Sequence, residues 1–184
     1  MPALYVPTRA GLAWVGSSLP CTPVPLATTK HTLAVAEVGL SIESRYEGVR
    51  VLTDRELRQE IAIWRAQDGT ATPVTAAWLG TDELSTPQTP GWDIPAKPKT
   101  HCPDLVLRDH DGGLAAIEVE LTAKNEARLR STLEMYARAS KYRRVDYFIS
   151  DERLERTLER ALSSMPPEDR PTNLSVVRRS FLHV

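Results

Sequence analysis

The chain has 184 residues, of which 41% are hydrophobic and 26% charged, and a formal net charge of −1 at pH 7. These values indicate a globular protein of one domain. They exclude a nucleic-acid or membrane partner attracted by net charge alone, so any basic surface must be local. No apolar run approaches the ~20 residues of a membrane span and no secretory signal is visible, so we expect a cytoplasmic protein with no membrane partner. Cys21 and Cys102 lack the spacing of metal ligands and are expected to be free thiols.

The first part of the chain predicts a short extension ahead of the main domain. Residues 1–30 are rich in Pro and Thr and are expected to form an N-terminal extension or a winged-helix remnant, with one short helix that ends at Gly16. The main domain is expected to cover residues 31–184. It begins with a helix over residues 31–46, where apolar side chains recur at helical spacing.

A second helix and a long connecting segment follow. Thr53 and Glu56 form the pattern of a capping box, which predicts a helix over about residues 54–66. Residues 67–100 contain several Pro, Gly and Thr, and a structureless loop of this length is unusual in a compact domain. We therefore expect a hairpin or flap within this segment.

The second half of the chain has a clearer alternation of strands and helices. Two apolar runs joined by a Gly-Gly turn predict a β-hairpin. The expected elements in order are strands over 104–108 and 114–122, a helix over 125–142, a strand over 145–149, a helix that Ser150 caps, and a strand over 174–182. This order predicts an α/β fold with a mixed β-sheet flanked by helices.

The second hairpin strand carries two glutamates between Val, Ile and Leu residues. Glu118 and Glu120 are two positions apart, so their side chains point to the same face of a strand. If the two strands pair, Asp104 can converge with them. Buried carboxylates need a positive partner, and three of them together suit Mg²⁺ or Mn²⁺. Such a metal can activate water and stabilise the charge that develops on a phosphate, and Lys124 could add a cation beside it.

The same alternation is compatible with a second interpretation. Glu118 and Glu120 could lie on the exposed face of an edge strand, with Ile117, Val119 and Leu121 pointing into the core. In that case the two carboxylates would be solvated and would form no site.

Basic residues follow the carboxylates and are expected to contact a phosphate backbone, with a solvated helix face as the alternative. These candidate DNA-binding residues are Arg128, Arg130, Arg138, Lys141, Arg143 and Arg144. The alternation of Glu and Arg over residues 151–160 is expected to reflect pairing on a helix surface. His31 and His101 are expected to be structural.

Pro103-Asp104 followed by Glu118-x-Glu120 resembles the motif of the PD-(D/E)XK nuclease superfamily. The resemblance implies a restriction-endonuclease-like fold, a Mg²⁺ or Mn²⁺ cofactor, and metal ligation by Asp104 and Glu118. The last motif position is usually Lys and here is Glu120, a further ligand or base-side group, with Lys124 able to supply the missing cation. Related nucleases often add an acidic residue from the preceding helix, which makes Glu60 a candidate fourth ligand.

A narrower resemblance is to replication-relaxation-type proteins of actinobacterial plasmids and mobile elements. The matching pieces are Thr8–Leu12, His31–Val35, Leu52–Arg58, Pro103-Asp104 and Glu118–Lys124. This resemblance implies a DNA endonuclease in plasmid or mobile-element replication, transfer or defence. The alternatives are a catalytically inactive accessory protein that binds DNA, a replication protein or a relaxase, and a homodimeric assembly protein that uses residues 67–100 as an arm.

Overall fold

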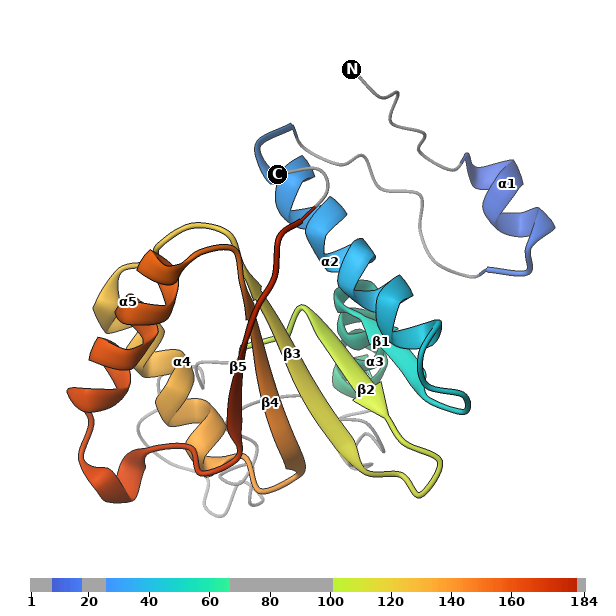
Figure 1. Ribbon diagram of the computed structural model, residues 1–184. Coiled ribbons are helices and arrows are strands. Elements are labelled where there is room, and N and C mark those ends of the chain that lie inside the picture. The colour runs from blue at the N-terminus through green and yellow to red at the C-terminus, as the bar shows by residue number, and fades with distance from the viewer. Residues whose placement is uncertain (1–7, 18–25, 67–100, 182–184) are drawn as a thin grey trace, which may run out of the picture.

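The computed structural model describes residues 8–17, 26–66 and 101–181 (Figure 1). The helices are α1 (Arg9–Trp14), α2 (Thr29–Glu43), α3 (Asp54–Ala66), α4 (Glu126–Arg138) and α5 (Glu152–Ser163), with 3-10 turns η1 (Leu26–Thr28) and η3 (Pro167–Asp169). The strands are β1 (Arg50–Thr53), β2 (Leu105–Arg108), β3 (Leu114–Glu120), β4 (Tyr142–Ile149) and β5 (Leu174–Arg178). The flap expected within residues 67–100 lies outside the described residues.

The strands form one mixed sheet in the order β1-β2-β3-β4-β5. β1, β2 and β3 are antiparallel neighbours, whereas β3, β4 and β5 run parallel. The parallel pairs are connected by α4 and α5, as parallel strands require a crossover. The predicted α/β fold with a mixed sheet flanked by helices is therefore confirmed.

Helices cover both faces of the sheet (Figure 1). On one face, Val106 and Ala116 of the sheet pack in the same core cluster as Leu133 of α4 and Leu158 of α5. On the other face, a second cluster joins sheet residues to α2; its members include Ala34, Val38, Ile42, Leu105, Ile117 and Val119. Alternate side chains of β3 therefore enter different cores, so its whole length is buried.

Local sequence signals account for several element ends. The predicted capping box is confirmed: the Thr53 backbone N–H donates to Glu56 Oε2 at 2.8 Å, and the Glu56 N–H lies 3.5 Å from Thr53 Oγ1. The predicted hairpin turn is also confirmed, since the Asp109 N–H donates to the Gly113 carbonyl at 2.9 Å. Gly112 adopts φ +80° in this turn, a conformation that glycine accepts without a Cβ clash.

The elements differ from the expectations in four places, one of which is the last strand, expected over 174–182, which ends at Arg178. The short strand β1 was missed, because four residues carry too little alternation to register as a pattern. The helix expected to continue to Tyr142 ends at Arg138, because the backbone from Tyr142 onward pairs with β3 and from Val145 onward also with β5. The cap of α5 is Asp151 and not Ser150, since Asp151 Oδ1 accepts from the Leu154 N–H at 3.0 Å.

None of the helices in the described part of the chain combines the length and the apolar character that crossing a bilayer requires.

Candidate functional site

The central strand β3 buries both glutamates of the sequence motif. Glu118 is 2% exposed and Glu120 is 9% exposed. β3 lies between β2 and β4, and all seven of its residues are buried. The interpretation of Glu118 and Glu120 as exposed residues of an edge strand is therefore wrong, because β3 has neither a free edge nor an exposed face.

Glu118 is held by two side chains from outside the strand. The Tyr136 hydroxyl of α4 donates to Glu118 Oε1, and His101 Nε2 lies 2.6 Å from the same oxygen. The His101 and Tyr136 rings meet edge to face, with centroids 5.9 Å apart. Burial and the nearby Glu118 raise the pKa of Tyr136 well above its usual value, so its hydroxyl keeps the proton that it donates.

Glu120 forms an ion pair with Lys124, whose Nζ lies 2.6 Å from Glu120 Oε2. Burial raises the pKa of Glu120, Lys124 opposes this effect, and the charges of Glu118 and Asp104 add to it. Lys124 is therefore the partner of the buried oxygen Oε2, through both charge and a short N–H···O contact. The raised pKa of Glu120 means that this partner does not fully offset burial and the neighbouring acidic charges.

Lys124 responds to all three acidic side chains. Burial lowers its pKa, but Glu118, Glu120 and Asp104 together outweigh burial and leave the pKa raised. The ammonium group therefore stays protonated at neutral pH. The structure brings together the four residues that the sequence analysis placed in one site, at the C-terminal end of β3.

Asp104 lies at the entrance to β2 and is fixed by the neighbouring strand and helix. Its Oδ2 accepts from the Val119 N–H at 2.8 Å and lies 3.3 Å from His31 Nε2 of α2. The same His31 nitrogen lies 3.0 Å from the Val119 carbonyl oxygen. The hydrogen bond to Asp104 raises the pKa of His31, against the effect of burial. His31 therefore links the α2 layer to the end of the sheet where the acidic side chains gather.

The arrangement has the donor chemistry of a hard divalent cation but is not assembled as a metal centre. No three or more His, Cys, Asp or Glu side chains of the described residues converge closely enough to hold a metal ion. Each carboxylate instead has a partner within the protein, namely His31, His101, Tyr136 or Lys124. Carboxylate oxygens are nevertheless the ligands that Mg²⁺ and Mn²⁺ prefer.

Glu60 is not brought to this cluster. The charged groups that affect it are Arg108, Arg50 and Glu56, and burial raises its pKa. Arg108 is opposite Arg50 in the sheet and four residues beyond Asp104, about 13 Å along β2 at ~3.3 Å per residue. The helical face shared by Glu56 and Glu60 runs back along the sheet, away from the end where the site lies.

The basic segment is spread along the sheet and is not gathered beside the acidic cluster. Arg143 pairs with Asp111 at 2.7 Å and Arg144 with Asp146 at 2.8 Å. Arg144 is opposite Ala115, whereas Glu120 is opposite Ile149 at the other end of the same pair of strands. This separation is about 16 Å at ~3.3 Å per residue.

The other members of the segment also follow the course of α4. Arg130 pairs with Glu134 at 3.5 Å, and Lys141 Nζ lies 5.7 Å from the centre of the Tyr142 ring. Arg128 and Arg138 are exposed near opposite ends of the helix. Because α4 runs back along the sheet, only its first turns lie near Glu120.

Sequence reasoning missed three residues of the site. His31 and His101 were expected to be structural, and Tyr136 was not among the expected site residues. The signal for Tyr136 was its helical spacing from Leu129 and Leu133, which places it on the same buried face of α4. A hydroxyl group on a buried face needs a hydrogen-bond partner. No comparable signal marks the two histidines, since their partners are 73 or more positions away for His31 and 17 away for His101.

Comparison of the chain with protein-family models, curated proteins and solved structures finds no match. The interpretation of the acidic cluster therefore rests on its own residues and geometry.

Proposed function

We propose that the protein is a metal-dependent DNA endonuclease with a restriction-endonuclease-like fold, acting in plasmid or mobile-element replication, transfer or defence. The observation that carries the proposal is the grouping of acidic side chains at the end of a buried strand. Asp104 Oδ2 accepts from the N–H of Val119, the residue between Glu118 and Glu120, and Lys124 Nζ lies 2.6 Å from Glu120 Oε2. Acidic groups coupled in this way repel one another, and a divalent cation would relieve that repulsion.

Asp104, Glu118 and Glu120 would hold Mg²⁺ or Mn²⁺. When bound, the metal would supply an activated water and would stabilise negative charge on the scissile phosphate. Lys124 would stabilise the same charge from the protein side, in place of the Lys that the nuclease motif usually carries at the position of Glu120. His101 and Tyr136 would orient Glu118, and His31 would orient Asp104, because each contacts its carboxylate directly.

Plasmid DNA in Mg²⁺ or Mn²⁺ is the substrate that tests this proposal. We expect nicking or linearisation by the wild type and its loss in Asp104→Asn, Glu118→Gln and Lys124→Met. Glu60→Gln is the matched control, since Glu60 is a partly buried acidic residue with Arg50 and Arg108 as neighbours, and it should retain activity. If the wild type and Glu118→Gln are equally inert while both bind DNA, cleavage is the wrong activity.

A second candidate function is a catalytically inactive accessory protein that binds DNA or a replication or relaxase partner. The observation that favours it is that the three carboxylates are already engaged by side chains of the protein, Asp104 by His31, Glu118 by Tyr136 and Glu120 by Lys124. Calorimetric titration with Mn²⁺ separates the two candidates. A nuclease should bind Mn²⁺ in a way that Asp104→Asn abolishes, and an accessory protein should show no binding that depends on Asp104.

A further inference from the structure

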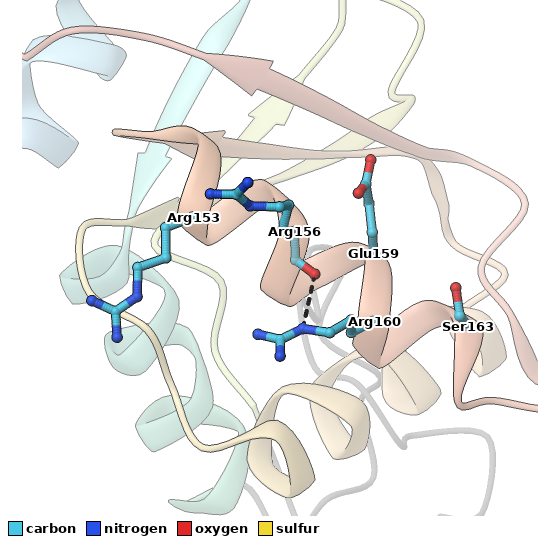
Figure 2. A pocket seen from close by; sticks show the side chains of 5 residues that line it. All are labelled: Arg153, Arg156, Glu159, Arg160 and Ser163. Carbon is cyan, nitrogen blue, oxygen red and sulfur yellow. Dashed lines mark hydrogen bonds between the residues drawn. The ribbon is translucent and has the colours of Figure 1, made fainter.

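We propose that Arg153, Arg156 and Arg160 of α5 form a contact surface for the phosphate backbone of DNA. These positions are spaced by three and four residues, so they lie along one side of the helix. With Glu159 and Ser163 they line an open hollow of about 470 Å³ (Figure 2). The inference rests on the proposed function, because it names the surface that would hold the DNA substrate.

The acidic residues of α5 neutralise only part of this surface, because the pairing along the helix expected from the sequence is present for Glu152 and Arg156 but not for Glu155. Glu155 forms its ion pair with Arg178 of β5 at 2.5 Å and not with an arginine of its own helix. Glu152 pairs with Arg156 at 3.5 Å. Among the described residues, neither Arg153 nor Arg160 forms a salt bridge.

The guanidinium groups of Arg153 and Arg160 are exposed, and that of Arg160 is held by hydrogen bonds within the helix. Arg160 Nε donates to the Arg156 carbonyl oxygen at 3.3 Å, the contact drawn in Figure 2. Arg160 Nη2 also donates to Thr157 Oγ1 at 3.2 Å. These bonds to neutral groups direct the side chain without cancelling its charge, so the charge stays available to an anion.

The surface adjoins the acidic cluster. Thr157 lines a small internal space together with Glu120 and Lys124, and it is also the acceptor for Arg160. α5 begins directly after β4, whose last residue Ile149 is opposite Glu120. A DNA strand on α5 would therefore pass beside the end of the sheet where cleavage is proposed, which Arg143 and Arg144 cannot achieve from the other end.

The dimensions suit a phosphate backbone. Seven residues of helix separate Arg153 from Arg160, about 10 Å at ~1.5 Å per residue. Successive phosphates of one DNA strand advance by about 3.4 Å along the duplex axis. Three guanidinium groups spread over this distance can contact neighbouring phosphates of one strand, each through charge-assisted hydrogen bonds.

The test measures DNA binding in EDTA, so that it does not depend on a metal or on cleavage. A short fluorescein-labelled DNA duplex is titrated at several salt concentrations with the wild type and with Arg153→Gln/Arg156→Gln/Arg160→Gln. We expect the triple substitution to raise Kd by at least about tenfold and to reduce the slope of log K against log salt by about 2.7, or 0.9 for each lost phosphate contact. Replacing the same residues by Lys should retain most of the slope, and Glu159→Gln should tighten binding.

A second triple variant, Arg9→Gln/Arg45→Gln/Arg58→Gln, removes equal charge from exposed residues of α1, α3 and the turn that follows α2. It should bind DNA nearly as the wild type does. Equal losses in both triple variants, an unchanged salt slope in the α5 variant, or no DNA binding by the wild type would overturn the inference. Far-UV circular dichroism and the unfolding midpoint verify that each variant is folded.

Two further measurements separate DNA binding by α5 from lipid binding and from the nuclease proposal. If the α5 substitutions abolish binding to phosphatidylserine vesicles but leave DNA binding unchanged, the surface binds lipid headgroups and the inference is overturned. Plasmid cleavage is scored independently. A protein that loses DNA affinity through α5 but never cuts contradicts the nuclease proposal alone, whereas one that cuts with an unchanged salt slope in the α5 variant contradicts this inference alone.

Discussion

Among the described residues, Tyr136 is one of the two side chains that contact the buried carboxyl group of Glu118. A carboxylate removed from water costs several kcal/mol unless hydrogen bonds compensate it. Tyr136 donates from within the core, and His101 contacts the same oxygen from the partly buried side. The polar contacts of Glu118 therefore affect the stability of the protein as well as the proposed chemistry.

We expect Tyr136→Phe to lower the free energy of unfolding by about 1–3 kcal/mol, because it removes a hydrogen bond to a buried carboxylate. Tyr147→Phe is the matched control: Tyr147 is equally buried, but its hydroxyl has no hydrogen-bond partner among the described residues. Removing the Tyr147 hydroxyl should change the free energy of unfolding little. Urea unfolding followed by circular dichroism measures both, and equal losses would contradict this account of Glu118.

Cys102 provides a test of burial at the edge of the site. Burial, with added effects of Asp54, raises the pKa of its thiol to about 12. Only the thiolate is nucleophilic, so we expect slow alkylation by iodoacetamide at neutral pH and a large acceleration when urea unfolds the chain. Mass spectrometry of the peptide that contains Cys102 separates it from Cys21. Rapid alkylation of the folded protein would contradict the raised pKa.

At the scale of elements, the start of α5 shows how the tertiary structure selects one of two neighbouring residues as the N-cap. Ser150 and Asp151 are both good N-cap residues, and the sequence does not choose between them. In the structure Asp151 Oδ1 caps the Leu154 N–H, while Ser150 Oγ only donates to Asp151 Oδ2 at 3.3 Å. The last residue of β4 determines the choice, because Ile149 still pairs with β5.

We expect Asp151→Ala to lower the urea midpoint and Ser150→Ala to lower it less. The Leu154 N–H lowers the pKa of the Asp151 carboxyl below its usual 3.8. A lowered pKa in the folded state means that the stabilisation is present above the unfolded pKa and is lost as pH falls through the folded pKa. The difference between wild type and Asp151→Ala should therefore shrink in acid. A difference that persists at the lowest pH would assign the effect to something other than the carboxylate cap.

At the scale of the molecule, the two helical layers share one sheet. Leu133 of α4 and Val38 of α2 are both fully buried, on opposite faces. β3 contributes side chains to both cores in alternation, so neither layer can separate without exposing the same strand. We infer that the described domain unfolds as one cooperative unit.

Leu133→Ala should lower the free energy of unfolding by about 2–5 kcal/mol and Val38→Ala by about 1–3 kcal/mol, through lost burial and the cavity left behind. Leu40→Ala is the control within α2, because Leu40 is 67% exposed. Near-UV and far-UV circular dichroism should report a single coincident transition for every variant. Separate transitions would mean that the layers unfold independently.

Much of the architecture follows from local patterns. Helical periodicity, the Thr53–Glu56 capping box and the Gly-Gly turn predicted the five helices and the hairpin, because these signals depend on neighbours within a few residues. The sequence also predicted that four residues lie together, namely Asp104, Glu118, Glu120 and Lys124. This prediction was possible because strand pairing across a tight turn and the i,i+4 spacing of Glu120 and Lys124 are short-range relations.

Only the tertiary structure decided what surrounds these four site residues. The sequence left Glu118 and Glu120 either buried or solvated, and the position of β3 between two strands chose burial. The tertiary structure also places His31 against Asp104 and Glu155 against Arg178. These contacts join residues that are 73 and 23 positions apart in the sequence. Such partners depend on which elements pack together, and a pattern of neighbouring residues carries no information about that packing.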